Sequence, residues 1–341
     1  MFRLPLFLLL IAFSSTMIHA QDVSCFDEYV ESEELFRLEE ITIRNGDVSL
    51  SAELYLPKSE GLYPALLLLP GGGNNVNNLR NVPIYLAKRA AACGIIALFY
   101  DKRGTGNSSG EYSETDFNDL ISDAEAAVDF LASHKEVNNK QIGASGFSQG
   151  GRLIANLAVR NNSVSFIAGV SGPINRVGPN RYYAFKNSLD RTQLSDSVKS
   201  LILPYWEEHF NALEARDHER SLALDDEIRE ASTNIYRSLL PPYHADRDQN
   251  PIYNSMGLDL LSELKNLSIP WYSIYGEEDR IVPAKQSIEN IKEAMELAKN
   301  ENFTIELIPG VNHSLLNPGT QEQIPFEKKI FEWVLMVIQE S

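Results

Sequence analysis

Residues 146–151 read Gly-Phe-Ser-Gln-Gly-Gly, directly after the apolar stretch 141–145 and directly before the helix-like run 152–158. The pattern Gly-x-Ser-x-Gly therefore stands between an expected strand and an expected helix. Such a turn is so tight that the positions two before and two after the serine must lack bulky side chains, and the serine takes a strained backbone conformation with an exposed hydroxyl. The pattern also arises by chance, but its flanks favour the interpretation that Ser148 is a nucleophile.

The segments around this turn predict a doubly wound sheet. Two strands before it are apolar without alternation, which is typical of strands covered on both faces by helices. Two still earlier segments alternate apolar and polar residues around Asn45-Gly46-Asp47, which is typical of a hairpin with one solvent-exposed face. The fold class is therefore α/β, with a mostly parallel sheet that begins antiparallel and has helices on both faces. The expected strands are 39–44, 48–56, 65–69, 95–100, 141–147 and 164–170, and the expected helices are 83–92 and 117–134.

The alternation of expected strands and helices stops after residue 173 and resumes at the expected strands 269–275 and 303–307. The stretch between has helical spacing and is too long for a loop, so it predicts a helical cap inserted into the sheet domain. Most of its aromatic residues are expected to form the cap's own core, and the remainder to line an apolar pocket. These aromatics are Tyr182, Tyr183, Phe185, Tyr205, Trp206, Tyr236, Tyr243 and Tyr253. The predicted segments are a signal peptide at 1–20, an N-terminal segment at 21–37, the first part of the core at 38–173, the cap at 174–257 and the second part of the core at 258–341.

The first 20 residues have the features of a cleaved secretory signal, with Arg3 ahead of an apolar run that is too short to span a bilayer. The sequence therefore predicts a secreted or periplasmic protein without stable membrane insertion. The formal net charge of −17 repels phosphate backbones, so nucleic acid is not expected as a partner. The two cysteines, Cys25 and Cys93, permit one disulfide, but a buried free thiol at Cys93 is an equal alternative.

A serine hydroxyl needs a base within hydrogen-bond reach and usually an acid that orients this base. Of the six histidines, only His313 lies in a loop that follows an expected strand of the second half of the core. Carboxylates follow the preceding strand, and among them Asp279 is the preferred acid, with Glu278 as the alternative. The predicted catalytic residues are Ser148, Asp279 and His313, in the chain order serine, acid, histidine.

An oxyanion that forms at the substrate carbonyl needs preorganised N–H donors. The run Pro-Gly-Gly-Gly at 70–73 follows an expected strand and brings side-chain-free backbone toward the serine. We predict that the backbone amides of Gly72 and Gln149 form the oxyanion hole. A phosphate-binding loop is the competing interpretation of the glycines, but the Lys-Ser or Lys-Thr that it requires does not follow them.

These motifs together make the chain resemble the α/β-hydrolase superfamily over about residues 38–341, and within it the bacterial esterases and acyl hydrolases similar to the dienelactone hydrolase and prolyl-oligopeptidase branches. The loop 100–110, Tyr-Asp-Lys-Arg-Gly-Thr-Gly-Asn-Ser-Ser-Gly, adds to the resemblance, which implies structural roles for Asp101 and Arg103. One departure is Pro70, where many relatives carry histidine. The superfamily includes both esterases and peptidases with the same serine motif.

The sequence predicts a serine esterase that acts on small or medium acyl esters through an acyl-enzyme, with the cap selecting the substrate. No cofactor is expected, and no metal site is expected because His and carboxylates do not cluster at ligand spacing. The expected partner is a small-molecule ester. The alternatives are a secreted peptidase of the prolyl-oligopeptidase type, for which Glu207-Glu208 or Glu277-Glu278 would have to bind a free amine, and a non-catalytic binding protein on the same fold.

Overall fold

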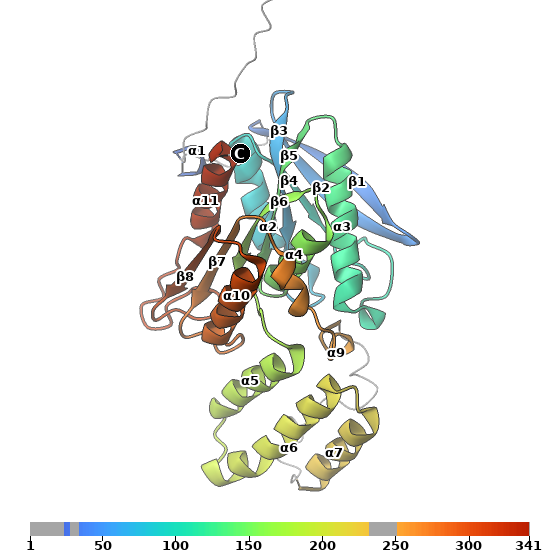
Figure 1. Cartoon of the computed structure of the whole chain (residues 1–341), viewed down its shortest axis with the longest axis vertical. Coiled ribbons are helices and arrows are strands. Elements are labelled where there is room, and N and C mark those ends of the chain that lie inside the picture. The colour runs from blue at the N-terminus through green and yellow to red at the C-terminus, as the bar shows by residue number, and fades with distance from the viewer. Residues whose placement is uncertain (1–23, 28–33, 232–250, 341) are drawn as a thin grey trace, which may run out of the picture.

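The computed structural model of the chain describes residues 24–27, 34–231 and 251–340 (Figure 1). The predicted signal at 1–20 therefore lies outside the described residues, as do Tyr236 and Tyr243 of the predicted cap. Within the described ranges, none of the helices combines the length and the apolar content that crossing a bilayer would take.

Eight strands form one sheet in the order β1-β2-β4-β3-β5-β6-β7-β8. The β1–β2 hairpin pairs antiparallel with itself and with β4, and every later pairing is parallel, as the sequence predicts. The carboxyl ends of β5, β7 and β8 therefore meet at one edge of the sheet, where open α/β sheets form their sites. The strands are β1 (Phe36–Asn45), β2 (Val48–Pro57), β3 (Tyr63–Leu69), β4 (Ile96–Tyr100), β5 (Val137–Phe147), β6 (Val164–Val170), β7 (Trp271–Gly276) and β8 (Phe303–Ile308).

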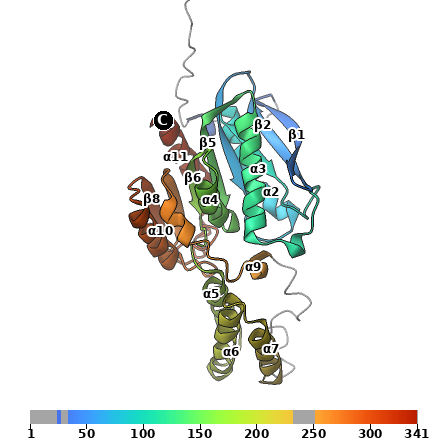
Figure 2. The same cartoon turned by 45° about the vertical axis from the view of Figure 1, so that its right-hand side comes forward.

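Helices cover both faces of this sheet (Figures 1 and 2). Alternate residues of β3 point to opposite faces, so Leu67 belongs to the core under α3, α4 and α10, whereas Leu68 belongs to the core under α2 and α11. Six helices of the sheet domain lie within the described residues. They are α1 (Ser24–Asp27), α2 (Val76–Ala92), α3 (Phe117–Ser133), α4 (Gln149–Arg160), α10 (Ala284–Ala298) and α11 (Phe326–Glu340), with 3-10 turns η1 (Tyr112–Glu114) and η3 (Ser262–Asn266).

Helix α2 begins at Val76 and not at Pro83, where the sequence analysis placed its start. Proline favours the first turn of a helix because it lacks the N–H that the helix interior uses. Here Pro83 stands inside the helix, and the expected start at residue 83 was wrong. The extra turns matter because they carry Leu79 and Val82 toward the serine.

The segment between β6 and β7 holds α5 (Val177–Asp190), α6 (Asp196–Glu214), α7 (His218–Ala231) and α9 (Pro251–Asn254). Helices α5 to α7 lie together beyond one end of the sheet (Figures 1 and 2). They pack through their own aromatic residues, since the rings of Phe185 and Trp206 are 4.0 Å apart and those of Trp206 and Phe210 are 5.3 Å apart.

Cys25 and Cys93 form a disulfide, with 5.7 Å between their Cα atoms. The alternative of a buried free thiol at Cys93 is therefore wrong. The two cysteines are 68 positions apart, and the sequence gave no sign of their pairing, which depends on α1 lying beside α2 and α11. Phe26 of α1 packs against Phe331 of α11 at 4.9 Å, and against Tyr85 of α2 at 6.3 Å. The short N-terminal helix thus joins two helices on the same face of the sheet.

Candidate active site

Ser148 lies between β5 and α4 with φ 52° and ψ −114°, a conformation that residues other than glycine rarely adopt. The turn is as tight as the motif predicts. A Cβ added to Gly146 would lie 2.3 Å from the backbone of Gly150, and one added to Gly150 would lie 2.4 Å from the Leu69 carbonyl oxygen. These clashes explain why glycine stands two positions to each side of the serine.

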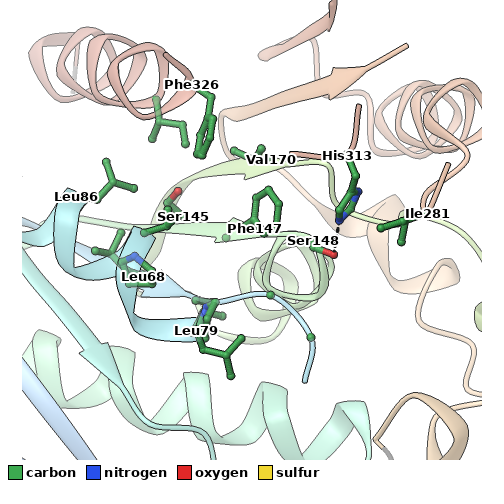
Figure 3. Close-up of a pocket in the computed structure, with 18 of the residues that line it drawn as sticks. Leu68, Leu79, Leu86, Ser145, Phe147, Ser148, Val170, Ile281, His313 and Phe326 are labelled. Atoms are coloured by element: carbon green, nitrogen blue, oxygen red, sulfur yellow. Dashed lines mark hydrogen bonds between the residues drawn. The ribbon is translucent and has the colours of Figure 1, made fainter. Parts of the chain in front are cut away.

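A continuous chain of hydrogen bonds links Ser148, His313 and Asp279. The Oγ of Ser148 is 3.0 Å from Nε2 of His313 (Figure 3). Nδ1 of the same ring is 2.7 Å from Oδ2 of Asp279. The structure thus brings together three side chains that span 165 positions of the sequence. Because the carboxylate faces Nδ1, the neutral ring holds its proton there and presents Nε2 to the hydroxyl as an acceptor.

The acid in this series of hydrogen bonds is Asp279 and not the alternative Glu278, whose side chain is exposed. Asp279 is 2 % exposed, and its other oxygen, Oδ1, accepts the backbone amides of Ile281 at 2.8 Å and Val282 at 2.9 Å. The loop after β7 therefore fixes Oδ1, while Oδ2 contacts His313 in the loop after β8. Tyr183 of α5 donates to the Asp279 carbonyl at 2.7 Å, so the inserted helices also contact this loop.

The two predicted oxyanion residues lie side by side at the turn after β3 and at the start of α4. A Cβ on Gly72 would be 3.8 Å from the Cβ of Gln149, and Gly72 lines the same pocket as Ser148. Gln149 is the first residue of α4, where backbone amides are unpaired and the helix dipole favours negative charge. The arrangement can provide backbone donors for an oxyanion.

Lys102 is a residue of this site that the sequence analysis missed. It is buried, and its Nζ donates to the carbonyls of Gly71 at 2.9 Å and Gly73 at 2.6 Å and to Oε1 of Gln149 at 3.3 Å. One ammonium group thus joins both sides of the oxyanion region. Burial lowers the pKa of Lys102 to about 7. The only signal in the sequence was a lysine inside the motif that includes Asp101 and Arg103.

The two other charged residues of that motif contact α3 and the loop itself. Arg103 pairs with Asp123 at 2.7 Å and Asp119 at 2.9 Å on α3. Asp101 accepts the Asn107 amide at 3.1 Å, and a Cβ on Gly106 would collide with it. Both contacts stabilise the loop after β4.

An apolar pocket of about 410 Å³ opens at Ser148, within the size range of small-molecule sites (Figure 3). Its walls come mainly from β3, α2, β5 and α11. Among the described residues of the insertion only Ile252 lines it, so the expectation that aromatic residues of the cap do so is wrong for those that the structure describes. The lining residues are Leu68, Leu69, Pro70, Gly71, Gly72, Leu79, Val82, Pro83, Leu86, Ser145, Gly146, Phe147, Ser148, Val170, Ile252, Ile281, His313, Phe326 and Ile330.

The sheet topology, with a serine on the turn after its fifth strand, defines an α/β hydrolase, and solved structures agree. Est1E from Butyrivibrio proteoclasticus, solved with ferulic acid bound, superposes with a TM-score of 0.55 over 88 % of this chain and 98 % of its own, at 15 % identity. The model of the X-Pro dipeptidyl-peptidase (S15) family matches residues 45–315, and the chain belongs to that family.

Two curated relatives align with large parts of the chain. The uncharacterized protein YcjY of Escherichia coli is 32 % identical over 175 residues, which are 49 % of this chain and 52 % of YcjY. Esterase EstD of Thermotoga maritima is 26 % identical over 315 residues, which are 89 % of this chain and 66 % of EstD. The chain thus spans between about half and two thirds of the length of these relatives.

Proposed function

We propose that the protein is a serine hydrolase that cleaves carboxylic esters through an acyl-enzyme. The observation that carries the proposal is the series of hydrogen bonds from Asp279 through His313 to Ser148. Ser148 and His313 line an apolar pocket. A hydrogen-bonded acid, base and hydroxyl are the parts that nucleophilic acyl transfer requires.

In this mechanism Oγ of Ser148 attacks the ester carbonyl while Nε2 of His313 takes the hydroxyl proton. Asp279 stabilises the imidazolium that forms, and the amides of Gly72 and Gln149 donate to the oxyanion. Collapse of the tetrahedral intermediate breaks the bond to the alcohol, which leaves with the proton from His313. Water then attacks the acyl-enzyme with the same histidine as base, releasing the acid and restoring the serine.

The second candidate function is peptide hydrolysis, which the family description favours. Release of a dipeptide from a free N-terminus calls for a carboxylate near the substrate amine. Among the described residues that line the pocket, none is a carboxylate. The four glutamates considered for this role, Glu207, Glu208, Glu277 and Glu278, are exposed and lie outside the pocket lining. The pocket therefore favours esters, and the esterase EstD supports the same choice.

A paired substrate panel tests the proposal. Purified protein is assayed with p-nitrophenyl acetate and butyrate and with X-Pro p-nitroanilides, before and after treatment with a fluorophosphonate, with Ser148→Ala as the control. We expect ester turnover, its loss on phosphonylation, and a phosphonate adduct on the peptide that contains Ser148. Anilide turnover with a higher kcat/KM than ester turnover would identify a peptidase instead, and ester turnover that persists in Ser148→Ala would exclude the mechanism.

Replacing Lys102 with methionine is expected to lower kcat about tenfold, because the Gly71 and Gly73 carbonyls lose the donor that fixes the oxyanion turn. The effect is indirect, so it should be smaller than the loss of about 10²–10³ in kcat that removal of an oxyanion donor itself causes. The variant should also lack one pH effect. In the folded wild type the pKa of Lys102 is about 7, so the unfolded protein binds this proton more tightly than the folded protein does. The free energy of unfolding of the wild type therefore rises between pH 7 and 10.

Urea unfolding of wild type and Lys102→Met at several pH values measures this difference, with the exposed Lys140→Met as the matched control. The difference in unfolding free energy between wild type and Lys102→Met should grow in favour of wild type as the pH rises. A difference that stays constant with pH, together with an unchanged kcat, would show that Lys102 does not support the turn.

A further inference from the structure

The residues that line the pocket lie on two sides of Ser148, and the two sides differ in their surroundings. In Figure 3, His313 and Ile281 lie on one side of the serine, whereas Leu68, Leu86, Ser145 and Phe326 lie on the other, beyond Phe147. We call the second part, lined by those four residues, the buried arm. It runs along the face of the sheet that α2 and α11 cover, away from helices α5 to α7.

The position of His313 decides which part of an ester each side can hold. This inference rests on the proposed function, in which His313 delivers a proton to the leaving alcohol. The alcohol oxygen must therefore lie on the His313 side of the serine, near Ile281. The acyl group, on the other side of the attacked carbonyl, then points past Phe147 toward the buried arm.

The chemistry of the buried arm is that of a site for hydrocarbon. Leu68, Leu86 and Phe326 are each at most 5 % exposed, and the hydroxyl of Ser145 is the one polar side-chain group among the four residues. A sugar, a charged group or a peptide would leave its polar groups there without partners, which is costly. An alkyl chain needs none.

We propose that the buried arm holds the acyl group of the substrate as an extended aliphatic chain, and that α2 and α11 set the chain length. In Figure 3 Leu86 of α2 and Leu68 of β3 lie farthest from His313, and Phe326 of α11 lines the same arm. Each methylene that enters the arm raises kcat/KM about fourfold, until the chain meets these side chains. The substrate class is therefore a medium-chain fatty acyl ester.

The test is an ester series from p-nitrophenyl acetate to laurate, read as the ratio of kcat/KM for each chain length to that for acetate. Leu86→Trp fills the arm and Leu86→Ala enlarges it. Asn81→Trp adds the same bulk at an exposed position of the same helix, and Ile281→Trp adds it on the His313 side. Thermal midpoints show whether each variant folds.

We expect wild type to prefer a medium chain over acetate by at least about tenfold. Leu86→Trp should move the preferred length down and Leu86→Ala should move it up, with Asn81→Trp like wild type. If folded Leu86→Trp and Leu86→Ala keep the wild-type preference, or if Ile281→Trp alone shortens the preferred chain, the inference is overturned while the esterase proposal stands. If wild type hydrolyses no ester in a Ser148-dependent manner, the proposed function itself fails.

Discussion

Replacing Asp279 with asparagine is expected to lower kcat for ester hydrolysis about 10⁴-fold without unfolding the protein. The local hydrogen bonds give the reason. Oδ1 accepts the amides of Ile281 and Val282, so an asparagine would keep its carbonyl oxygen there and turn its NH₂ group toward Nδ1 of His313. The imidazole would then hold its proton on Nε2, where it could no longer take the proton of Ser148.

Steady-state kinetics with a short ester measures this loss, and far-UV circular dichroism checks the fold. Glu278→Gln is the matched control, because it makes the same chemical change one residue earlier on an exposed side chain. It should keep kcat within about twofold, since surface substitutions have small effects. If the Glu278 variant loses more activity than the Asp279 variant, the assigned acid is wrong.

Replacing Gly150 with alanine is expected to lower kcat by about 10²–10³ and to destabilise the fold by about 1–3 kcal/mol. The added Cβ would lie 2.4 Å from the carbonyl oxygen of Leu69 and 2.7 Å from that of Pro70, and both are backbone atoms that cannot rotate away. The start of α4 must therefore separate from the turn after β3. That movement carries the amides of Gln149 and Gly72 apart.

Gly72→Ala is the comparison variant for this prediction. Its Cβ would meet nothing closer than the Cβ of Gln149 at 3.8 Å, which is an ordinary contact. Differential scanning calorimetry should therefore give a wild-type midpoint for Gly72→Ala and a lower one for Gly150→Ala. Equal midpoints for the two variants, with kcat of Gly150→Ala near wild type, would show that the elbow tolerates a side chain.

Much of the fold could be predicted from local patterns in the sequence. Unbroken apolar runs indicated the parallel strands, because a strand covered on both faces has no polar face to alternate with. The positions of Ser148, Asp279 and His313 also followed from sequence, since each comes directly after a strand and the carboxyl ends of parallel strands meet at one edge. Their catalytic roles remain predictions.

Three features depend on contacts between distant segments and could not be predicted in this way. Lys102 acts on a turn about thirty residues earlier, and nothing near it in sequence shows that its ammonium points there. The Cys25–Cys93 bond requires α1 to lie beside α2. Part of the pocket wall was expected from aromatic residues of the cap, yet the wall comes mainly from β3, α2, β5 and α11, whose apolar residues look like ordinary core.

The order of the parts along the chain also has a consequence for biosynthesis. The glycine turn follows β3 and Ser148 follows β5, whereas Asp279 and His313 follow β7 and β8, the last two strands to be made, which end the sheet at one edge. A growing polypeptide therefore contains a complete serine elbow long before it contains the base. In the proposed mechanism, the hydroxyl of Ser148 therefore lacks its base until the final two strands have joined the sheet.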